Sequence, residues 1–157
     1  MIVYRISRRI YANDLSGIGA GLYGGRWNPK GINLVYTAGS ISLACMEYLV
    51  HNIHVMGLND ISLSKIEIRV SADIEPITEK VLPSDWSEKS YLPLSTQNIG
   101  RQFFEKGTEY MLKVPSVIIP DEYNYLLNPL HHLHDKAKII EQINPFVMDE
   151  RLYQGRK

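Results

Sequence analysis

The chain has 157 residues, with 17 basic and 17 acidic side chains, so its formal net charge at neutral pH is zero. This length suffices for one domain with its own core, and the neutral balance argues against a nucleic-acid binder that relies on neutralising phosphates. We expect the single cysteine, Cys45, to be a buried, unreactive thiol in its apolar run. No charged-then-apolar leader opens the chain and no apolar run reaches about 18 residues, so we expect a soluble cytoplasmic protein without a membrane partner.

Two short strands are expected on either side of a glycine-rich segment. The alternation over residues 1–7 predicts a half-buried strand, and the β-rich run 33–38 predicts a second one. Between them, Gly19, Gly21 and Gly24 match the spacing of a dinucleotide-binding loop. No strand pattern precedes these glycines, and the glycines and proline that follow disfavour a helix. We therefore expect a flexible loop here and not a Rossmann unit.

The triplet Arg26-Trp27-Asn28 lies in this glycine-rich segment. Glycines allow the backbone to come close to a ligand, while Arg26 and Asn28 would supply directed polar groups. The alternative is an ordinary glycine-rich turn in which Trp27 fills the core. The segment by itself supports both interpretations.

Residues 40–53 predict a helix with Ser40 or Ser42 as its cap and an apolar surface around most of its circumference. Glu47, His51 and His54 fall together in one narrow polar arc. This arc is either a solvated edge or the wall of a cleft, in which Glu47 accepts a hydrogen bond from a nearby histidine. A metal site formed by these three side chains would lack the usual HExxH arrangement.

The second half of the chain predicts further strands and one helix. Residues 65–71 alternate like a strand with Ile66, Ile68 and Val70 directed inward. Residues 75–94 are rich in proline, serine and charge and predict a surface excursion, and 95–107 predict a helix that ends at Gly107.

The last third is less regular. Residues 109–120 predict a strand pair, or one strand broken at Pro115. The spacing of His131, His132 and His134 is too tight for one metal ion and predicts a hydrogen-bonded surface turn. Residues 137–143 fit a helix or a strand. The whole is a mixed α+β domain dominated by strands.

An ordered set of short motifs resembles one known family. The set comprises YRIS with Arg5, GRWN with Arg26, VYTA with Tyr36, ACMEYL with Glu47, VPSVI with Ser116, and NYLLNPLH near the end. In this order the motifs resemble the RES-domain family, the toxin half of bacterial RES–Xre toxin–antitoxin pairs. The resemblance spans essentially the whole chain, so we expect residues 1–157 to form a single RES domain.

The resemblance implies an ADP-ribosyltransferase-like fold, in which a split pair of small sheets with flanking helices encloses an NAD cleft. Members of the family consume NAD as a substrate, by hydrolysis or phosphorolysis of the nicotinamide–ribose bond, and some ADP-ribosylate a protein. The partner implied is an Xre-type helix-turn-helix antitoxin, which would carry any DNA contact. Whether the chain also forms a homodimer stays open.

The chemistry of the matching residues fits such a reaction. Cleavage of the nicotinamide–ribose bond passes through an oxocarbenium-like transition state, which a carboxylate such as Glu47 would stabilise. Arg5 and Arg26 can hold the pyrophosphate through forked hydrogen bonds, and Tyr36 offers a flat face to the nicotinamide ring. The expected catalytic residues are thus Glu47, Arg26 and Tyr36.

The remaining expected NAD contacts come from Asn28 and Ser116, and the latter could bond the nicotinamide amide or a ribose hydroxyl. A serine satisfied by the backbone is the alternative for Ser116. The reaction needs no metal, because nicotinamide is already a good cationic leaving group. Two other functions stay open: a module that binds NAD or ADP-ribose without turnover, and a toxin directed at nucleic acid through Arg26, Trp27 and scattered lysines.

Overall fold

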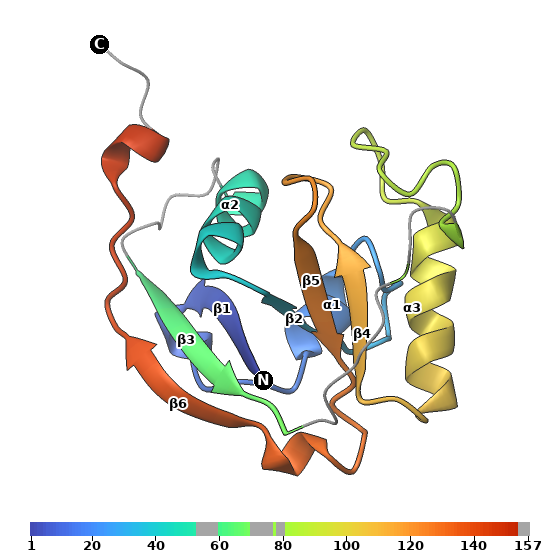
Figure 1. The fold of residues 1–157 in the computed structure, drawn as a ribbon, viewed down its shortest axis with the longest axis horizontal. Coiled ribbons are helices and arrows are strands. Elements are labelled where there is room, and N and C mark those ends of the chain that lie inside the picture. Colours follow the sequence, from blue (N-terminus) through green and yellow to red (C-terminus); the bar gives the residue numbers. More distant parts are fainter. Residues whose placement is uncertain (53–59, 70–76, 78–80, 154–157) are drawn as a thin grey trace.

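The computed structural model describes residues 1–52, 60–69, 77 and 81–153. Six strands form one antiparallel sheet in the order β4-β5-β2-β1-β3-β6 (Figure 1). The strands are β1 (Ile2–Arg8), β2 (Val35–Ala38), β3 (Ile61–Glu67), β4 (Met111–Pro115), β5 (Tyr123–Leu127) and β6 (Lys138–Ile143). The helices are α1 (Ile18–Tyr23), α2 (Ile41–Asn52) and α3 (Leu94–Lys106), with short 3-10 turns at Arg9–Tyr11, His134–Lys136 and Glu150–Leu152.

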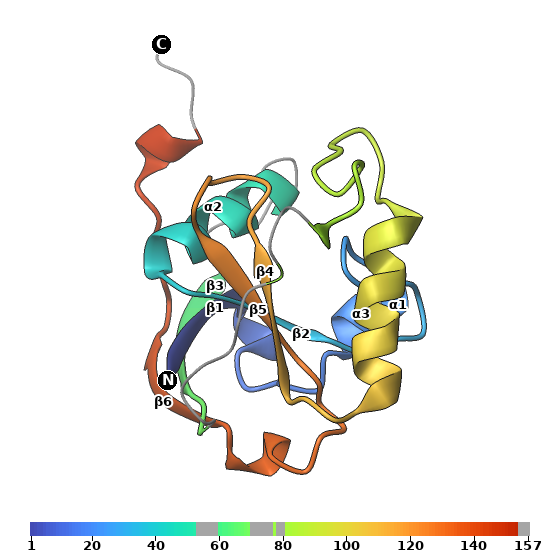
Figure 2. The same cartoon turned by 45° about the vertical axis from the view of Figure 1, so that its right-hand side comes forward.

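The sheet consists of two three-stranded halves. Strands β1 and β2 meet at a single register pair, Tyr4 opposite Ala38, whereas each of the other neighbouring pairs aligns four to seven residues. One half is therefore β4-β5-β2 and the other is β1-β3-β6. Helix α2 lies over the junction between the halves, and α3 stands beside β4 (Figures 1 and 2).

Apolar side chains cover both faces of the sheet. On one face, Val35, Leu127 and Met111 lie opposite one another on β2, β5 and β4 and pack with Val3 and Ile66. The other face carries a second cluster, in which α3 and the chain before β2 pack on β4 and β5. Its buried members are Trp27, Leu34, Phe103, Val114 and Leu126.

Most of the expected elements are confirmed. The N-terminal strand, the strand at 35–38 and α3 with its left-handed Gly107 cap are present. Helix α2 begins after Ser40, whose hydroxyl accepts the Leu43 amide at 3.1 Å. The apolar circumference of α2 is less buried than its sequence indicates, because Ile41 and Val50 are exposed and only one side of the helix packs on the sheet.

The strand expected at 65–71 begins four residues earlier. β3 spans Ile61–Glu67, with Ile66 and Ile68 fully buried, while Val70 lies outside the described residues. The ambiguous segment 137–143 is strand β6, and the strand before Ser116 ends at Pro115. The histidine turn is confirmed: the two ring nitrogens of His134 hydrogen-bond the Tyr110 hydroxyl and the Leu15 carbonyl, each at 2.9 Å.

The flexible loop expected at the glycine-rich segment is a short helix and a tight turn. Gly19 and Gly21 lie inside α1, so the Rossmann arrangement of strand, glycine loop and helix is absent there. A Cβ on Gly21 would approach the Asn33 Oδ1 to 1.8 Å. The glycine is needed for close packing rather than for flexibility. The interpretation in which Trp27 fills the core is confirmed, because only 3% of this residue is exposed.

Candidate functional site

The half-buried carboxylate of Glu47 lies in the middle of α2 and faces the β4–β5 hairpin. Its Oε1 accepts hydrogen bonds from Ser116 Oγ at 3.0 Å and from Asn124 Nδ2 at 2.5 Å. Its Oε2 lies 3.7 Å from Nε2 of His51, one turn along the helix. The side chain of Glu47 retains 23% exposure, so the group is enclosed without being sealed from solvent. The expected cleft-wall interpretation of Glu47 and His51 is therefore consistent with the geometry.

These contacts determine the charge state of Glu47. Burial raises the pKa of the carboxyl, but the nearby His51 and the hydrogen bonds from Asn124 and Ser116 together outweigh burial, and the net pKa lies below its ordinary value. Hydrogen bonding to the charged form stabilises that form. Glu47 is thus an ionised carboxylate at neutral pH in spite of its enclosure.

Ser116 has no hydrogen-bonding capacity left for a ligand. Its hydroxyl donates to Glu47 Oε1 and accepts the backbone amides of Ile118 and Ile119 at 3.0 and 3.1 Å. A hydroxyl has one donor and two acceptor sites, and all three are in use. Only 5% of the residue is exposed. In this structure Ser116 orients the carboxylate.

Helix α3 positions the loop that carries Arg26. The Thr96 hydroxyl donates to the Arg26 carbonyl at 2.6 Å, and the Gln97 amide donates to the Gly25 carbonyl at 3.0 Å. Gly100 lies directly against the backbone of Trp27, where an added Cβ would come within 1.6 Å of the carbonyl oxygen. The loop therefore sits rigidly on α3.

The Arg26 guanidinium spans from this loop to the segment before α3. It donates to the carbonyls of Trp86 and Glu88 at 2.8 and 2.7 Å. Burial lowers the pKa of Arg26, and the nearby Glu47 carboxylate offsets part of that effect. Two of the five N–H groups are used in this way, and no other hydrogen bond joins this guanidinium to a described residue. The expected surface excursion thus also contributes carbonyls that hold Arg26.

Tyr36 and Asn28 form a buried pair beside this loop. The Tyr36 hydroxyl donates to Asn28 Oδ1 at 2.7 Å and accepts the Trp27 amide at 3.1 Å, and burial raises the Tyr36 pKa well above its usual range. Asn28 is fully buried, and its amide nitrogen donates to the carbonyls of Ala20 and Ile32, each at 2.8 Å. Asn28 therefore supports the loop and Tyr36 from inside the protein.

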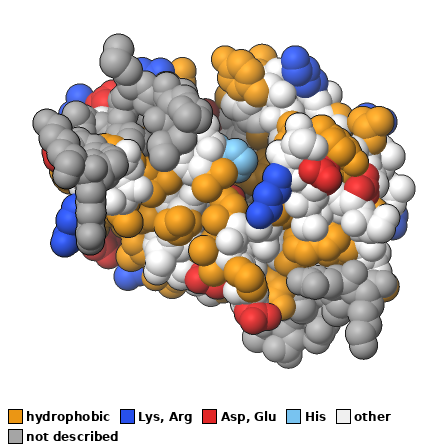
Figure 3. Space-filling view, turned by 90° about the horizontal axis from the view of Figure 1, so that it is seen from above, with side chains coloured by type: hydrophobic (Ala, Val, Ile, Leu, Met, Phe, Trp, Pro, Cys, Tyr) orange, Lys and Arg blue, Asp and Glu red, His pale blue; other side chains and the backbone are white. Residues whose placement is uncertain are grey.

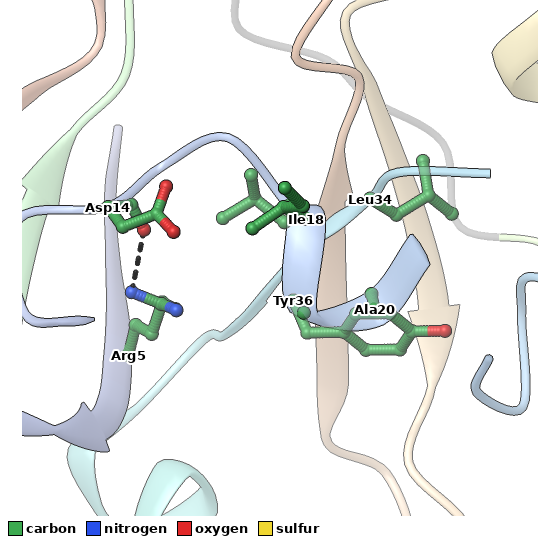
Figure 4. Close-up of a pocket in the computed structure, with 9 residues that line it drawn as sticks. Arg5, Asp14, Ile18, Ala20, Leu34 and Tyr36 are labelled. Atoms are coloured by element: carbon green, nitrogen blue, oxygen red, sulfur yellow. Dashed lines mark hydrogen bonds between the residues drawn. The ribbon is translucent and has the colours of Figure 1, made fainter. Parts of the chain in front are cut away.

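Arg5 follows Tyr4 on β1, so the two side chains point to opposite faces of the sheet. The Arg5 side chain lies under the chain that leads into α1. Its guanidinium donates to the carbonyls of Tyr11 and Asp14 at 3.2 and 3.0 Å, and burial lowers its pKa. Arg5 and Tyr36 line the same pocket, of about 140 Å³, at the opening between the two half-sheets (Figure 4). Asp14 and the start of α1 close its far side.

The structure thus brings five of the six predicted residues together in two linked groups, while the Arg5 guanidinium hydrogen-bonds the Tyr11 and Asp14 carbonyls and belongs to neither group. Glu47 and Ser116 touch each other, while Arg26, Tyr36 and Asn28 share one loop and its neighbouring strand. The Glu47 charge influences the pKa values of both Arg26 and Tyr36, which links the groups. Figure 3 shows a hollow at this end of the molecule, bordered by a histidine side chain.

Some residues at the site were not predicted. Asn124 contacts Glu47 directly, and Thr96 and Gln97 hold the Arg26 loop. Asn124 belongs to the NYLLNPLH motif, which was the available signal. Among the described residues no group of three or more His, Cys, Asp or Glu side chains could hold a metal ion, and His54 lies outside them. The described helices are all too short or too polar to span a membrane.

Comparisons with known proteins all point to the same family. The RES domain model matches residues 2–149. The chain is 39% identical over 153 residues to the protein named Toxin Res of Yersinia enterocolitica, covering 97% of this chain and 99% of that protein. It is 41% identical over 128 residues to the Prs ADP-ribosylating toxin of a Sphingobium species, covering 80% and 78% of the two chains.

The fold has a solved counterpart. A chain in the crystal structure of the MbcT–MbcA toxin–antitoxin complex of M. tuberculosis matches with a TM-score of 0.71 at 18% identity, covering 90% of this chain and 82% of that one. At this identity the likeness concerns the fold. The expected α+β, ADP-ribosyltransferase-like fold with its divided sheet is confirmed.

Proposed function

The chain belongs to the RES-domain family, and from that premise we propose that it is a toxin that cleaves the nicotinamide–ribose bond of NAD. The observation that carries this proposal is the Glu47 carboxylate, which accepts hydrogen bonds from Ser116 and Asn124 and lies 3.7 Å from His51. Its charge also affects the pKa values of Arg26 and Tyr36. The Glu47 carboxylate would stabilise the positive charge that develops on the ribose, and the Arg26 guanidinium would bind the pyrophosphate of the same substrate.

In this reaction Glu47 would hold the ribose 2′-hydroxyl and stabilise the oxocarbenium-like transition state. The unused donors of Arg26 would bind a pyrophosphate oxygen. Tyr36 would present its ring to the nicotinamide. Arg5, which lines a pocket together with Tyr36, would supply a second cation for the pyrophosphate. We assign Ser116 and Asn28 indirect parts, because the structure uses their polar atoms to hold Glu47 and Tyr36.

Transfer of the ADP-ribosyl group to a protein side chain is the second candidate. It is supported by the Sphingobium relative, which is named an ADP-ribosylating toxin. Cleavage of the glycosidic bond is common to both reactions, and only the acceptor differs.

A proton NMR experiment tests both candidates. NAD is incubated with the protein with and without phosphate, and the ribose product is identified. We expect release of nicotinamide together with ADP-ribose, or with its 1″-phosphate when phosphate is present. Release that depends on an added protein, with ADP-ribose attached to that protein, would favour the second candidate. Full retention of nicotinamide in every sample would refute the proposal and favour a module that only binds NAD.

We further propose that an antitoxin neutralises this activity in the cytoplasm, where its NAD substrate is abundant. The proposal is supported by the fold shared with a chain from a toxin–antitoxin complex. We expect this partner to be of the Xre type and to carry the DNA-binding module, since the present chain has no net positive charge.

A further inference from the structure

The Glu47 carboxylate is held through one of its two oxygens. Oε1 accepts Ser116 Oγ and Asn124 Nδ2 at 3.0 and 2.5 Å, whereas the nearest described partner of Oε2 is His51 Nε2, at 3.7 Å. Because an ionised carboxylate only accepts hydrogen bonds, Asn124 must direct its nitrogen toward Glu47, which fixes the orientation of the amide. Two donors on one oxygen fix the plane of the carboxylate and leave Oε2 as the oxygen available to a ligand.

The sheet explains how both donors reach the same oxygen. On β5, Asn124 lies opposite Val114 of β4 and Ala38 of β2. Directly opposed residues point to the same face, so Asn124 shares the face that carries α2. Ser116 lies two residues beyond Val114 and continues that face, as does Tyr36, two residues before Ala38. The two donors therefore come from the two strands of one hairpin.

We propose that Asn124 is a positioning residue which, with Ser116, holds Oε1 of Glu47 so that Oε2 meets the substrate. The role of the substrate in this statement rests on the proposed function, whereas the hold on the carboxylate is a property of the free protein. Asn124 is half-buried, and its bond to Glu47 is the one hydrogen bond that its side chain makes with the described part of the chain. Its action on the reaction is through Glu47.

The two hydrogen bonds to Oε1 predict how the Glu47 carboxyl titrates. The charged or titratable groups that face it are His51 on its own helix, and Arg26 and Tyr36 from the loop and strand beside it. Replacing Asn124 leaves these groups in place but removes one of the two hydrogen bonds to Oε1, which makes the ionised form of Glu47 less stable. Asn124→Ala should therefore raise the pKa of Glu47 by about one unit. Asn124→Asp keeps the side-chain volume but places a second carboxylate at the same oxygen, so it should raise that pKa further.

Carbon-13 NMR of labelled glutamate carboxyls measures this titration without any turnover, and Glu47→Gln identifies the resonance. The matched control is Glu122→Ala. Glu122 accepts the Ser40 hydroxyl at 2.9 Å and so also connects the hairpin to α2, but it does not contact Glu47. We expect an unchanged Glu47 pKa in the control and a raised one in both Asn124 variants. An unchanged pKa in folded Asn124→Asp would overturn the proposal, even if Asn124→Ala failed to fold.

Activity supplies the second readout. If the wild type consumes NAD, Asn124→Ala should lower kcat about tenfold with little change in KM, because the carboxylate is misplaced rather than the ligand lost. The acid limb of its kcat profile should move to higher pH, as the NMR titration does. Raised Glu47 pKa values with no NAD turnover by the wild type would refute the proposed function and leave the hold on Glu47 established. Normal NAD turnover together with an unchanged Glu47 pKa in both Asn124 variants would support the proposed function and refute the positioning role of Asn124.

Discussion

Replacing Glu47 with glutamine tests the site most directly, because it removes the charge and keeps the shape. The glutamine oxygen can still accept from Ser116 and Asn124, as Oε1 does in the wild type. The new NH₂ group takes the place of Oε2, so the attraction to His51, whose side chain is 69% exposed, is lost. Such an exposed pair contributes about 0–1 kcal/mol, and weaker hydrogen bonds to a neutral acceptor add a similar amount.

The two effects together lower the free energy of unfolding by at most about 2 kcal/mol, a decrease in Tm of less than about 8 °C for a chain of this size. Catalysis should suffer far more. The transition state loses one strong electrostatic contact, which corresponds to a decrease in kcat of about 100- to 1,000-fold. Nicotinamide release followed by NMR measures kcat, and thermal unfolding followed by circular dichroism measures Tm.

Glu105→Gln is the matched control, because Glu105 is an exposed carboxylate on α3. It should leave both kcat and Tm unchanged. If Glu47→Gln folds and consumes NAD within about threefold of the wild-type rate, Glu47 is not the catalytic carboxylate, and the electrostatic reasoning is wrong.

Arg26→Lys keeps the charge but loses the guanidinium fork, so calorimetry should show clearly weaker NAD binding; full affinity would refute a forked contact. Gly100→Ala should lower the free energy of unfolding in urea by about 3 kcal/mol, since its Cβ meets the Trp27 carbonyl, whereas Gly19→Ala, with open space around it, should be neutral or stabilising. Because Glu47 has a lowered pKa in the folded state, its contribution to stability is present above its unfolded pKa of about 4.3 and disappears as the pH falls through the folded value. The stability difference between the wild type and Glu47→Gln should therefore shrink below about pH 4, and a constant difference would contradict the lowered pKa. Finally, the antitoxin and a non-hydrolysable NAD analogue should bind in a mutually exclusive manner, and Arg26→Ala should weaken the binding of each. If calorimetry shows that the analogue binds the toxin–antitoxin complex as tightly as the free toxin, the antitoxin does not block the NAD site.

Periodicity and local signals predicted the elements that depend on nearby residues. The alternation in β1 and the Gly107 cap of α3 are properties of short segments, and both were found where expected. Strand β5 was missed, because its run of five residues is held in place by pairing with β4 and with β2, and β2 is remote in sequence. Its existence is a consequence of sheet pairing rather than of local pattern.

The glycine-rich segment shows why composition alone misled. A glycine can provide flexibility, a positive φ or room for a close contact, and these look alike in a sequence. At Gly21 and Gly100 the reason is a close contact, with Asn33 in one case and the Trp27 carbonyl in the other. Neither contact is visible without the fold, so a rigid helix and turn were expected to be a flexible loop.

For the site, sequence reasoning identified residue types better than it identified roles. Glu47 was singled out by its place in a polar arc, but its donors Ser116 and Asn124 lie 69 and 77 residues away along the chain. A resemblance to a family can point to a serine without saying what its hydroxyl contacts. Only the geometry shows that the Ser116 hydroxyl is fully engaged within the protein.

The two charges of the site are positioned by different parts of the molecule. Glu47 is oriented by the β4–β5 hairpin, whereas the Arg26 loop rests on α3 and its guanidinium is held by the segment before that helix. A change at Asn124 therefore removes a hydrogen bond from the Glu47 carboxylate and none from Arg26, whereas a change at Thr96 removes one from the Arg26 carbonyl and none from Glu47. Because contacts that are distant and share no partner contribute almost additively, paired substitutions in the two supports should combine additively in stability. In turnover they should not, because a single transition state must contact both charges at once.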